Sequence, residues 1–201
     1  MPLPRIFIIG PPAAGKTTLR TLIIDWMASQ GHKVAILGIE EANRALFPPN
    51  ADDDTYVYTE EGSIILLQRD TQIPLTLSWL ATQCAEAARS TGFILELAHQ
   101  KIGDALTAIA GDLLQGSLIL HLSAPLESRL QRNAQRKALR IPPEIVVSIP
   151  EKLTPAEVTE LTTKGATLMW FQTSEDLPSV WIRVQQGILT YLESTYTRSI
   201  S

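Results

Sequence analysis

The chain has 201 residues, with 17 basic and 21 acidic side chains and a net charge of −4. This balance favours neither nucleic acid nor an anionic membrane as a partner, and no apolar run approaches membrane-spanning length. The length is typical of one α/β domain with a sizeable core. Cys84, the single cysteine, cannot form an internal disulfide, and the N-terminus lacks a signal-peptide pattern. We therefore expect a cytoplasmic protein without a membrane segment.

Residues 6–18, IFIIGPPAAGKTT, contain the most specific motif of the chain. They fit the pattern GxxxxGK[ST] of a phosphate-binding loop, directly after an apolar run suited to a buried strand. The two glycines let the backbone turn tightly round an anion, so that successive N–H groups point at the phosphates of a nucleotide. Lys16 would reach the phosphate oxygens, and the Thr17 hydroxyl would bind Mg²⁺. The candidate nucleotide-binding residues are Gly10, Pro11, Pro12, Ala13, Ala14, Gly15, Lys16, Thr17 and Thr18.

A helix is predicted directly after this loop, from Lys16 to Ser29. Its apolar residues recur at the spacing of one buried helix face: Leu19, Leu22, Ile23, Trp26 and Met27. Strand, loop and helix in this order would place the positive end of the helix at the bound phosphate. The alternative is a glycine-containing turn that only resembles a phosphate-binding loop.

A second strand is predicted from Lys33 to Ile39, and charged residues follow it. Glu40 and Glu41 come directly after the strand, and Arg44 lies one helical turn further on. Because open α/β sheets bind ligands at the carboxyl ends of their strands, these residues are candidates for a site. The alternative is that both glutamates cap the next helix, where acids are favourable near the positive end.

Residues 45–72 have the least regular pattern in the chain. Two prolines and the acidic run Asp52–Asp54 indicate a loop, and the flanking segments TYVYT and SIILL are suited to pair as a small hairpin. A solvated turn is the simpler interpretation of the three aspartates, and metal binding is the alternative. A helix is predicted next, from about Pro74 to Ser90.

The next predicted strand, residues 93–98, carries one carboxylate in an otherwise apolar run. Burying an unpaired charge is unfavourable, so Glu96 needs a partner or a role. An acid beside a phosphate-binding loop often reaches the water shell of Mg²⁺, which makes Glu96, with Thr17, a candidate metal-binding residue. The alternative is a carboxylate at a strand end that meets solvent. His99 and His121 share no ligand spacing, so no histidine-based metal site is expected.

A basic cluster follows the next predicted strand, which covers residues 117–122. Its members are Arg129, Arg132, Arg136, Lys137 and Arg140. On one continuous helix, the four arginines would lie within an arc of roughly 80°. Since like charges on one face repel each other, contact with phosphate is the predicted role, and a solvated helix face is the alternative.

The C-terminal part of the chain continues the alternation of strands and helices. Thr154 and Glu157 form a capping-box pattern at the start of a short helix, which we expect to end at Gly165. A strand over 166–171 and a last helix that buries Trp181, Val184, Ile188 and Leu192 follow. The whole pattern predicts an α/β fold of three layers, with a five-stranded, mostly parallel sheet and helices on both faces.

The chain resembles the P-loop kinases of small molecules, the superfamily of adenylate, thymidylate and deoxynucleoside kinases. GPPAAGKTT at 10–18, GFILE at 92–96 and RLQRNAQRKALR at 129–140 carry the resemblance, the last two placed like the family's third-strand acid and lid. It implies one P-loop kinase-like domain over residues 1–201. An acceptor-side insert would cover about 45–72, and an arginine-rich lid would cover about 125–150.

By this resemblance, the chain would transfer phosphate from ATP to a small-molecule acceptor, with Mg²⁺ as the metal. The acceptor would be nucleoside-like or nucleotide-like, or another hydroxyl or phosphate compound. Glu40 or Glu41 would accept the hydroxyl proton, and Arg44 could hold an acceptor anion. The candidate catalytic residues are Lys16, Glu40, Glu41, Glu96, Arg132 and Arg136.

The chain departs from the family pattern in two places. The third-strand acid is Glu96 rather than Asp, and Leu97-Ala98-His99 follow it in place of an arginine-containing motif. No nucleoside-selecting motif is evident in residues 45–72. Two other functions therefore stay open: a nucleotide-binding switch or scaffold with little phosphoryl transfer, and a slow nucleoside triphosphatase that uses water as acceptor.

Overall fold

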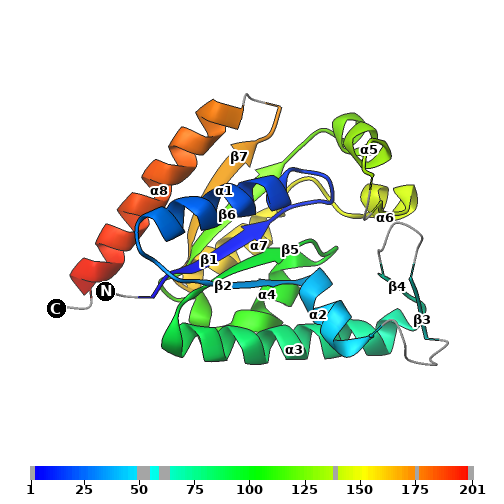
Figure 1. The fold of residues 1–201 in the computed structure, drawn as a ribbon, viewed down its shortest axis with the longest axis horizontal. Helices are drawn as coiled ribbons and strands as arrows, with labels where there is room; N and C mark the ends of the chain where they lie inside the picture. The colour runs from blue at the N-terminus through cyan, green and yellow to red at the C-terminus, as the bar shows by residue number, and fades with distance from the viewer. Residues whose placement is uncertain (1–2, 49–54, 59–63, 138–139, 175–176, 199–201) are drawn as a thin grey trace.

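Five parallel strands form the central sheet of the computed structural model, which describes residues 3–48, 55–58, 64–137, 140–174 and 177–198. Their order is β2-β5-β1-β6-β7, so that β1 lies in the middle (Figure 1). The strands are β1 (Arg5–Ile9), β2 (Ala35–Gly38), β5 (Phe93–Leu97), β6 (Leu118–Ser123) and β7 (Thr167–Gln172). The parallel pairing of all neighbours confirms the predicted α/β class.

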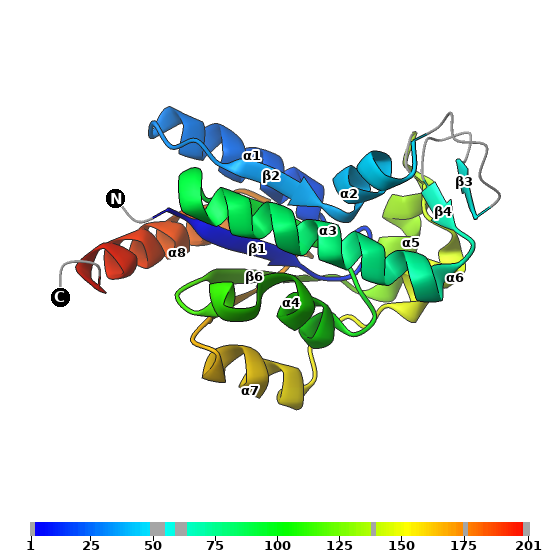
Figure 2. The same cartoon turned by 90° about the horizontal axis from the view of Figure 1, so that it is seen from below.

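Helices cover both faces of the sheet, as the alternation of strands and helices predicts (Figure 2). One face packs against α1 (Lys16–Ser29) and α8 (Leu177–Arg198). The other packs against α3 (Arg69–Ser90), α4 (Ile102–Ala110) and α7 (Pro155–Thr163), with the short 3₁₀ helix η1 (Gly111–Leu114) after α4. The predicted three-layer fold is confirmed.

Alternate residues of β1 enter two separate cores. Ile6 and Ile8 pack with α1 and α8, whereas Phe7 and Ile9 pack with α3 and α4 on the opposite face. Successive side chains of a strand point to opposite faces, and helices exclude water from both, so all four positions are apolar and fully buried. Phe7 also contacts Phe93 of β5 edge to face, with ring centroids 5.3 Å apart.

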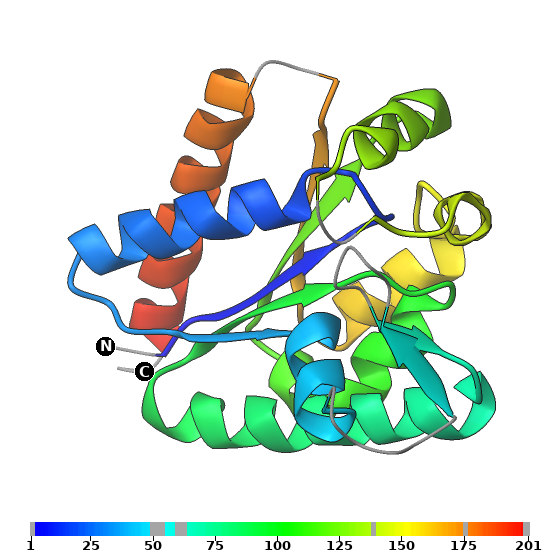
Figure 3. The same cartoon turned by 45° about the vertical axis from the view of Figure 1, so that its right-hand side comes forward.

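Smaller elements surround the carboxyl ends of the strands (Figure 3). On one side lie α2 (Ile39–Leu46) and a hairpin of β3 (Tyr56–Tyr58) and β4 (Ile64–Leu66). On the other side lie α5 (Leu126–Ala134) and α6 (Pro143–Ser148). The antiparallel pairing of β3 with β4 confirms the predicted hairpin, while Asp52–Asp54 lie outside the described residues.

The second predicted strand and the helix predicted from about Pro74 have other boundaries in the structure. The second strand is shorter than expected, because α2 begins at Ile39, directly after β2. Helix α3 begins before Pro74, at Arg69, and the proline lies inside the helix near its start. Proline has no N–H to donate, but the first turn of α3 does not depend on it. The N–H groups of Thr71 and Gln72 form that turn by donating to the carbonyl of Gln68.

The capping box at the start of α7 is confirmed in both directions. The Glu157 N–H donates to the Thr154 hydroxyl at 3.2 Å, and the Thr154 N–H donates to the Glu157 carboxylate at 2.8 Å. Across the residues that the structure describes, no helix combines the length and apolar character needed to cross a bilayer.

Candidate active site

The loop between β1 and α1 has a backbone that its glycines make possible. Gly10 has a φ of 140°, and a Cβ there would lie 2.1 Å from the carbonyl oxygen of Leu122 in β6. Gly15, at the start of α1, has a φ of 92°. Only glycine adopts these conformations without strain, and at position 10 only glycine fits beside the neighbouring strand. The loop is therefore pressed against the carboxyl end of the sheet.

Lys16 folds back over this loop and is buried, with 6% of its surface exposed. Its ammonium donates hydrogen bonds to the carbonyl oxygens of Gly10 and Pro11, at 2.9 and 2.8 Å. Burial lowers the pKa of Lys16 to about 8; Glu96 opposes this shift, and the charges of Arg136 and Arg129 add to it. A cation held in this way by neutral carbonyls would be stabilised by an anion, so the loop is electrostatically prepared for phosphate.

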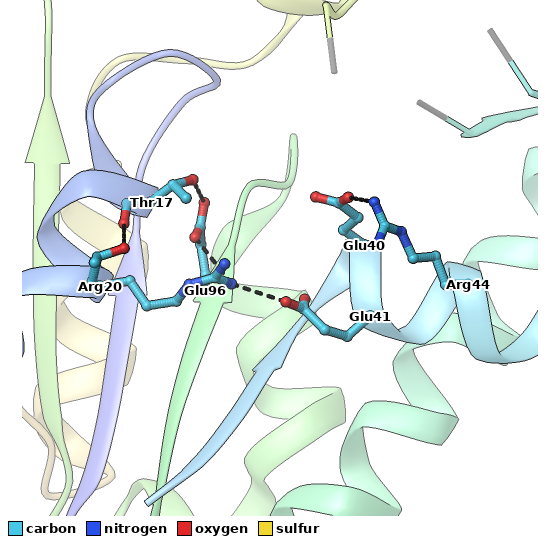
Figure 4. A network of polar contacts seen from close by, with 7 residues as sticks. Thr17, Arg20, Glu40, Glu41, Arg44 and Glu96 are labelled. Carbon is cyan, nitrogen blue, oxygen red and sulfur yellow. Dashed lines mark hydrogen bonds and ion pairs between the residues drawn. The ribbon is translucent and has the colours of Figure 1, made fainter. Parts of the chain in front are cut away.

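Thr17 and Glu96 meet at the first turn of α1, as the prediction of a shared metal-binding role requires. The Thr17 hydroxyl donates to Oε1 of Glu96 at 3.0 Å (Figure 4). Glu96 belongs to β5, which pairs with β1 next to the loop. The second oxygen of Glu96, Oε2, is buried and accepts no hydrogen bond from any residue that the structure describes, so this carboxylate keeps capacity to accept another partner.

Arg20 joins this pair to α2, a contact that the sequence analysis missed. Its Nη1 lies 3.2 Å from Oε1 of Glu41 and 3.4 Å from Oε2 of Glu96 (Figure 4). Gly38 leaves the space for this network, because a Cβ there would lie 2.6 Å from Oε2 of Glu41. The helical periodicity of α1 placed Arg20 one turn after Lys16, but no sequence pattern indicated that Glu41 would reach it.

The structure separates the two glutamates that follow β2. Glu41 points to Arg20 and Glu96, whereas Glu40 pairs with Arg44 one turn along α2, at 2.5 Å between Oε1 and Nη2 (Figure 4). Arg44 and Glu40 are both largely exposed, so their ion pair is a weak surface contact. Within the described part of the chain, neither carboxylate accepts a backbone N–H of α2, and both bind arginines instead.

The prediction of a single arginine face over residues 129–140 is wrong. Helix α5 ends at Ala134, so Arg136 and Arg140 lie beyond it. The Asn133 side chain turns the backbone by bonding to both the N–H and the carbonyl of Ile141, at 3.0 and 2.6 Å. Arg140 donates to the carbonyls of Ala134 and Arg136, which closes the end of the helix.

The side chain of Arg129 is buried and bonded to the protein backbone. It is 3% exposed, and its guanidinium donates to the carbonyls of Ala124, Val146 and Ile149, at 3.1, 2.8 and 3.3 Å. These bonds connect α5 to α6 and to the segment after it. Arg129 was part of the predicted phosphate-binding cluster, but its donors are directed at backbone carbonyls.

Arg132 and Arg136 are both connected with the loop between β1 and α1. Arg132 donates to the hydroxyl and the carbonyl of Thr173, the residue after β7. A Cβ at Gly15 would be 3.8 Å from the Thr173 methyl group, so this contact borders the loop. Arg136 is close enough to lower the pKa of Lys16. The sequence analysis selected both arginines, but it did not identify Thr173 as a partner.

His121 is a buried polar residue whose environment the sequence did not predict. It lies in β6, is 2% exposed and packs on Trp170, with ring centroids 4.4 Å apart. Burial lowers the pKa of His121 to about 4; Lys16 adds to this shift, and Glu157 opposes it. Among the described residues, none is a hydrogen-bond partner of its Nδ1. The ring borders a cavity of about 10 Å³ shared with Gly10 and Glu157, so this histidine is neutral beside the loop.

Comparisons with known proteins reveal similar folds. No protein-family model matches the chain, and no curated protein is similar to it in sequence. Similar solved structures include a sugar kinase from Janibacter sp. HTCC2649, with a TM-score of 0.56, 17% identity and coverage of 96% of this chain and 95% of the other. A shikimate kinase from Acinetobacter baumannii, solved with shikimate, has a TM-score of 0.56, 16% identity and coverage of 94% of each chain.

A gluconokinase from Sinorhizobium meliloti 1021 is also similar, with a TM-score of 0.55, 12% identity and coverage of 98% of this chain and 97% of the other. These matches span nearly the full length of both partners, although the identities are low. The five-stranded parallel sheet with helices on both faces matches the fold of these structures. The chain therefore has the fold of the P-loop small-molecule kinases.

Proposed function

We propose that the chain transfers phosphate from ATP to a small-molecule acceptor. The observation that carries this proposal is the buried Lys16 ammonium, held by the carbonyls of Gly10 and Pro11 beside the Thr17–Glu96 pair. A desolvated cation at the start of a helix, inside a glycine loop, suits a triphosphate better than any neutral ligand. The kinase fold of the similar structures supports the same proposal.

In this proposal, the residues of the loop bind the nucleotide and neutralise charge. Lys16 exchanges its two carbonyl partners for oxygens of the β- and γ-phosphates, and backbone N–H groups of residues 13–18 hold the remaining oxygens, since Pro11 and Pro12 have no N–H. Arg132 and Arg136 approach the phosphates from the predicted lid, about 125–150. Phosphoryl transfer depends mainly on positioning and on stabilising charge, which are the tasks that these side chains can perform.

The residues next to the loop also suit Mg²⁺. The Thr17 hydroxyl and the Glu96 carboxylate are hard oxygen donors, and no described residue donates a hydrogen bond to the buried Oε2 of Glu96. We therefore assign Thr17 and Glu96 to the metal, with Glu96 orienting its water shell. When bound, Mg²⁺ would supply positive charge next to the transferred phosphoryl group.

On the acceptor side, Glu40 is the better candidate base in this proposal. Its partner Arg44 forms a surface ion pair that exchanges readily, whereas Glu41 is engaged by the less exposed Arg20. A base is needed only by a hydroxyl acceptor. The similar structures, a sugar kinase, a gluconokinase and a shikimate kinase with shikimate, favour a hydroxyl compound over a phosphate. The insert at about 45–72 would border this acceptor.

ADP formation from ATP, measured with and without a panel of hydroxyl and phosphate acceptors, tests the proposal. We expect ADP to form faster with at least one acceptor and Lys16→Ala to abolish this reaction, while Lys33→Ala, which removes an exposed lysine away from the loop, leaves it unchanged. Equal ADP formation with and without every acceptor would identify a triphosphatase. Nucleotide binding without any ADP formation would identify a switch or scaffold.

A further inference from the structure

Arg20 holds two carboxylates with one nitrogen atom. Its Nη1 approaches Glu41 of α2 at 3.2 Å and Glu96 of β5 at 3.4 Å. The Arg20 and Glu96 side chains are each only 18% exposed. A single positive charge thus lies between two negative ones from separate elements. Water screens its interaction with Glu96 poorly and its interaction with Glu41, whose side chain is 37% exposed, more strongly.

The group that Arg20 connects is suited to a divalent cation. Two carboxylates and the Thr17 hydroxyl are hard oxygen ligands, and one oxygen of each carboxylate is buried without a hydrogen bond from the described part of the chain. Without the guanidinium, two negative charges would face each other and attract any available cation. With it, their net charge falls to −1, and the carboxylates already have a cationic partner.

We propose that Arg20 is a built-in counter-cation that prevents Glu41 and Glu96 from binding a divalent metal before a nucleotide is present. The inference rests on the proposed function, because it concerns how the metal reaches the nucleotide site. The phosphates of a nucleotide bring further negative charge next to Thr17, and this charge restores the attraction for the metal. The metal therefore enters with the nucleotide, and Arg20 acts as a positioning residue that does not touch the reacting atoms.

The local backbone preserves this arrangement. Gly38 ends β2 beside Glu41, and a Cβ at this position would lie 2.6 Å from Oε2 of Glu41 and 3.6 Å from Nη1 of Arg20. Its φ of −174° is ordinary extended backbone, so the reason for glycine here is space and not conformation. The absent side chain allows Glu41 to turn toward Arg20.

Binding of Mn²⁺ to the nucleotide-free protein, measured by electron paramagnetic resonance, tests the proposal without any catalysis. We expect the wild type to bind Mn²⁺ weakly, and Arg20→Met to bind it at least about tenfold more tightly, because one positive charge is removed within 4 Å of both carboxylates. Arg20→Lys should bind weakly again. The double variant Arg20→Met/Glu41→Gln should lose the gain, and Arg89→Met, which removes an exposed charge on α3, should behave as the wild type.

Unchanged Mn²⁺ affinity in Arg20→Met would overturn the proposal. So would tight Mn²⁺ binding by the wild type that Glu41→Gln abolishes. If Arg20→Met does not fold, Arg20→Gln, which can still donate hydrogen bonds to the carboxylates, takes its place with the same expectation. The thermal midpoint of the wild type gives a further measure: Mg²⁺ alone should leave it unchanged, and Mg²⁺ with ADP should raise it. These measurements do not depend on phosphate transfer. A negative result here would therefore contradict the role of Arg20 without contradicting the proposed function, and the reverse also holds.

Discussion

Arg132 donates two hydrogen bonds to Thr173, from Nη1 to the hydroxyl at 3.0 Å and from Nη2 to the carbonyl at 2.7 Å. This contact joins α5 to the segment that follows β7, next to the start of α1. The planar, forked guanidinium reaches two acceptors of one residue at once, which a lysine ammonium does with less geometric control. Arg129, one turn earlier on α5, directs its donors at carbonyls inside the protein.

We predict that the two arginines of α5 have different effects when replaced. Arg129→Met should lower the free energy of unfolding by about 3 kcal/mol, because buried carbonyls lose a charged donor. Urea unfolding measures this change. Lys137→Met, which alters an exposed residue of the same segment, serves as the control and should change stability little.

Arg132→Ala should lower the free energy of unfolding by no more than about 1 kcal/mol, because the side chain is partly exposed. Its effect should instead be on kcat, which we expect to fall at least about tenfold with little change in the affinity for ATP, as for a group that acts on the transition state. Steady-state kinetics measure the change in kcat, and calorimetry measures the affinity for ATP. An effect on stability alone would show that the contact with Thr173 is purely structural. Arg136→Ala is expected to follow the same kinetic pattern.

The pKa of Lys16 predicts proton uptake when a nucleotide binds in alkaline solution. Burial lowers this pKa from 10.5 to about 8 in the free protein, and a bound polyphosphate would raise it again. At about pH 9, binding should take up a proton on Lys16, whereas at about pH 7 the ammonium is already charged and little uptake is expected. Calorimetry in buffers of different ionisation enthalpy counts these protons. Lys16→Met should remove the uptake, and binding at about pH 9 without protons would contradict the assignment.

Replacing the two glutamates singly should distinguish their roles. Glu40→Gln should leave ATP binding intact and lower acceptor-dependent turnover by about 10²-fold, the range that a general base supplies. Its effect on stability should be below about 1 kcal/mol, because the pair with Arg44 is exposed.

Glu41→Gln serves as the matched comparison for Glu40→Gln. It removes one partner of Arg20 and should act on metal affinity more than on the acceptor. A loss of turnover in Glu41→Gln alone would show that Glu41, and not Glu40, is the base. Full turnover in both variants would favour a phosphate acceptor, or a protein that is not a kinase.

His121 predicts a loss of stability in acid. Its pKa is lowered from 6.5 to about 4 in the folded protein, so the unfolded chain binds a proton more readily between these values. The contribution to stability is complete above pH 6.5 and should fall by about 3 kcal/mol as the pH drops to about 4. His121→Phe keeps the contact with Trp170 and should lose less stability over this range in urea unfolding. His32→Gln, which leaves His121 in place, should retain the acid dependence of the wild type.

Local patterns determined most of the fold. The glycine spacing around 10–15 and the apolar run before it predicted a strand, loop and helix, since a phosphate-binding loop needs only neighbouring residues. Hairpin pairing near residues 56–66 and the capping box of Thr154 and Glu157 were predictable for the same reason, because their hydrogen bonds join residues close in sequence. The alternation of strands and helices was sufficient for the parallel sheet, because crossover connections require it. The loop residues, Glu96 and both glutamates after β2 were also selected from sequence.

Only the tertiary structure decided which charged side chains meet. Arg20 and Glu41 are distant in sequence, and their contact depends on where α1 and α2 stand at the end of the sheet and on the space left by Gly38. The basic cluster is divided in two ways: α5 ends at Ala134, so Arg136 and Arg140 lie beyond the helix, and within α5 Arg129 is enclosed by carbonyls whereas Arg132 reaches Thr173. A sequence pattern specifies the face of an element, but the partner of a long charged side chain depends on packing between elements. Burial, which sets the pKa of such groups, depends on the same packing.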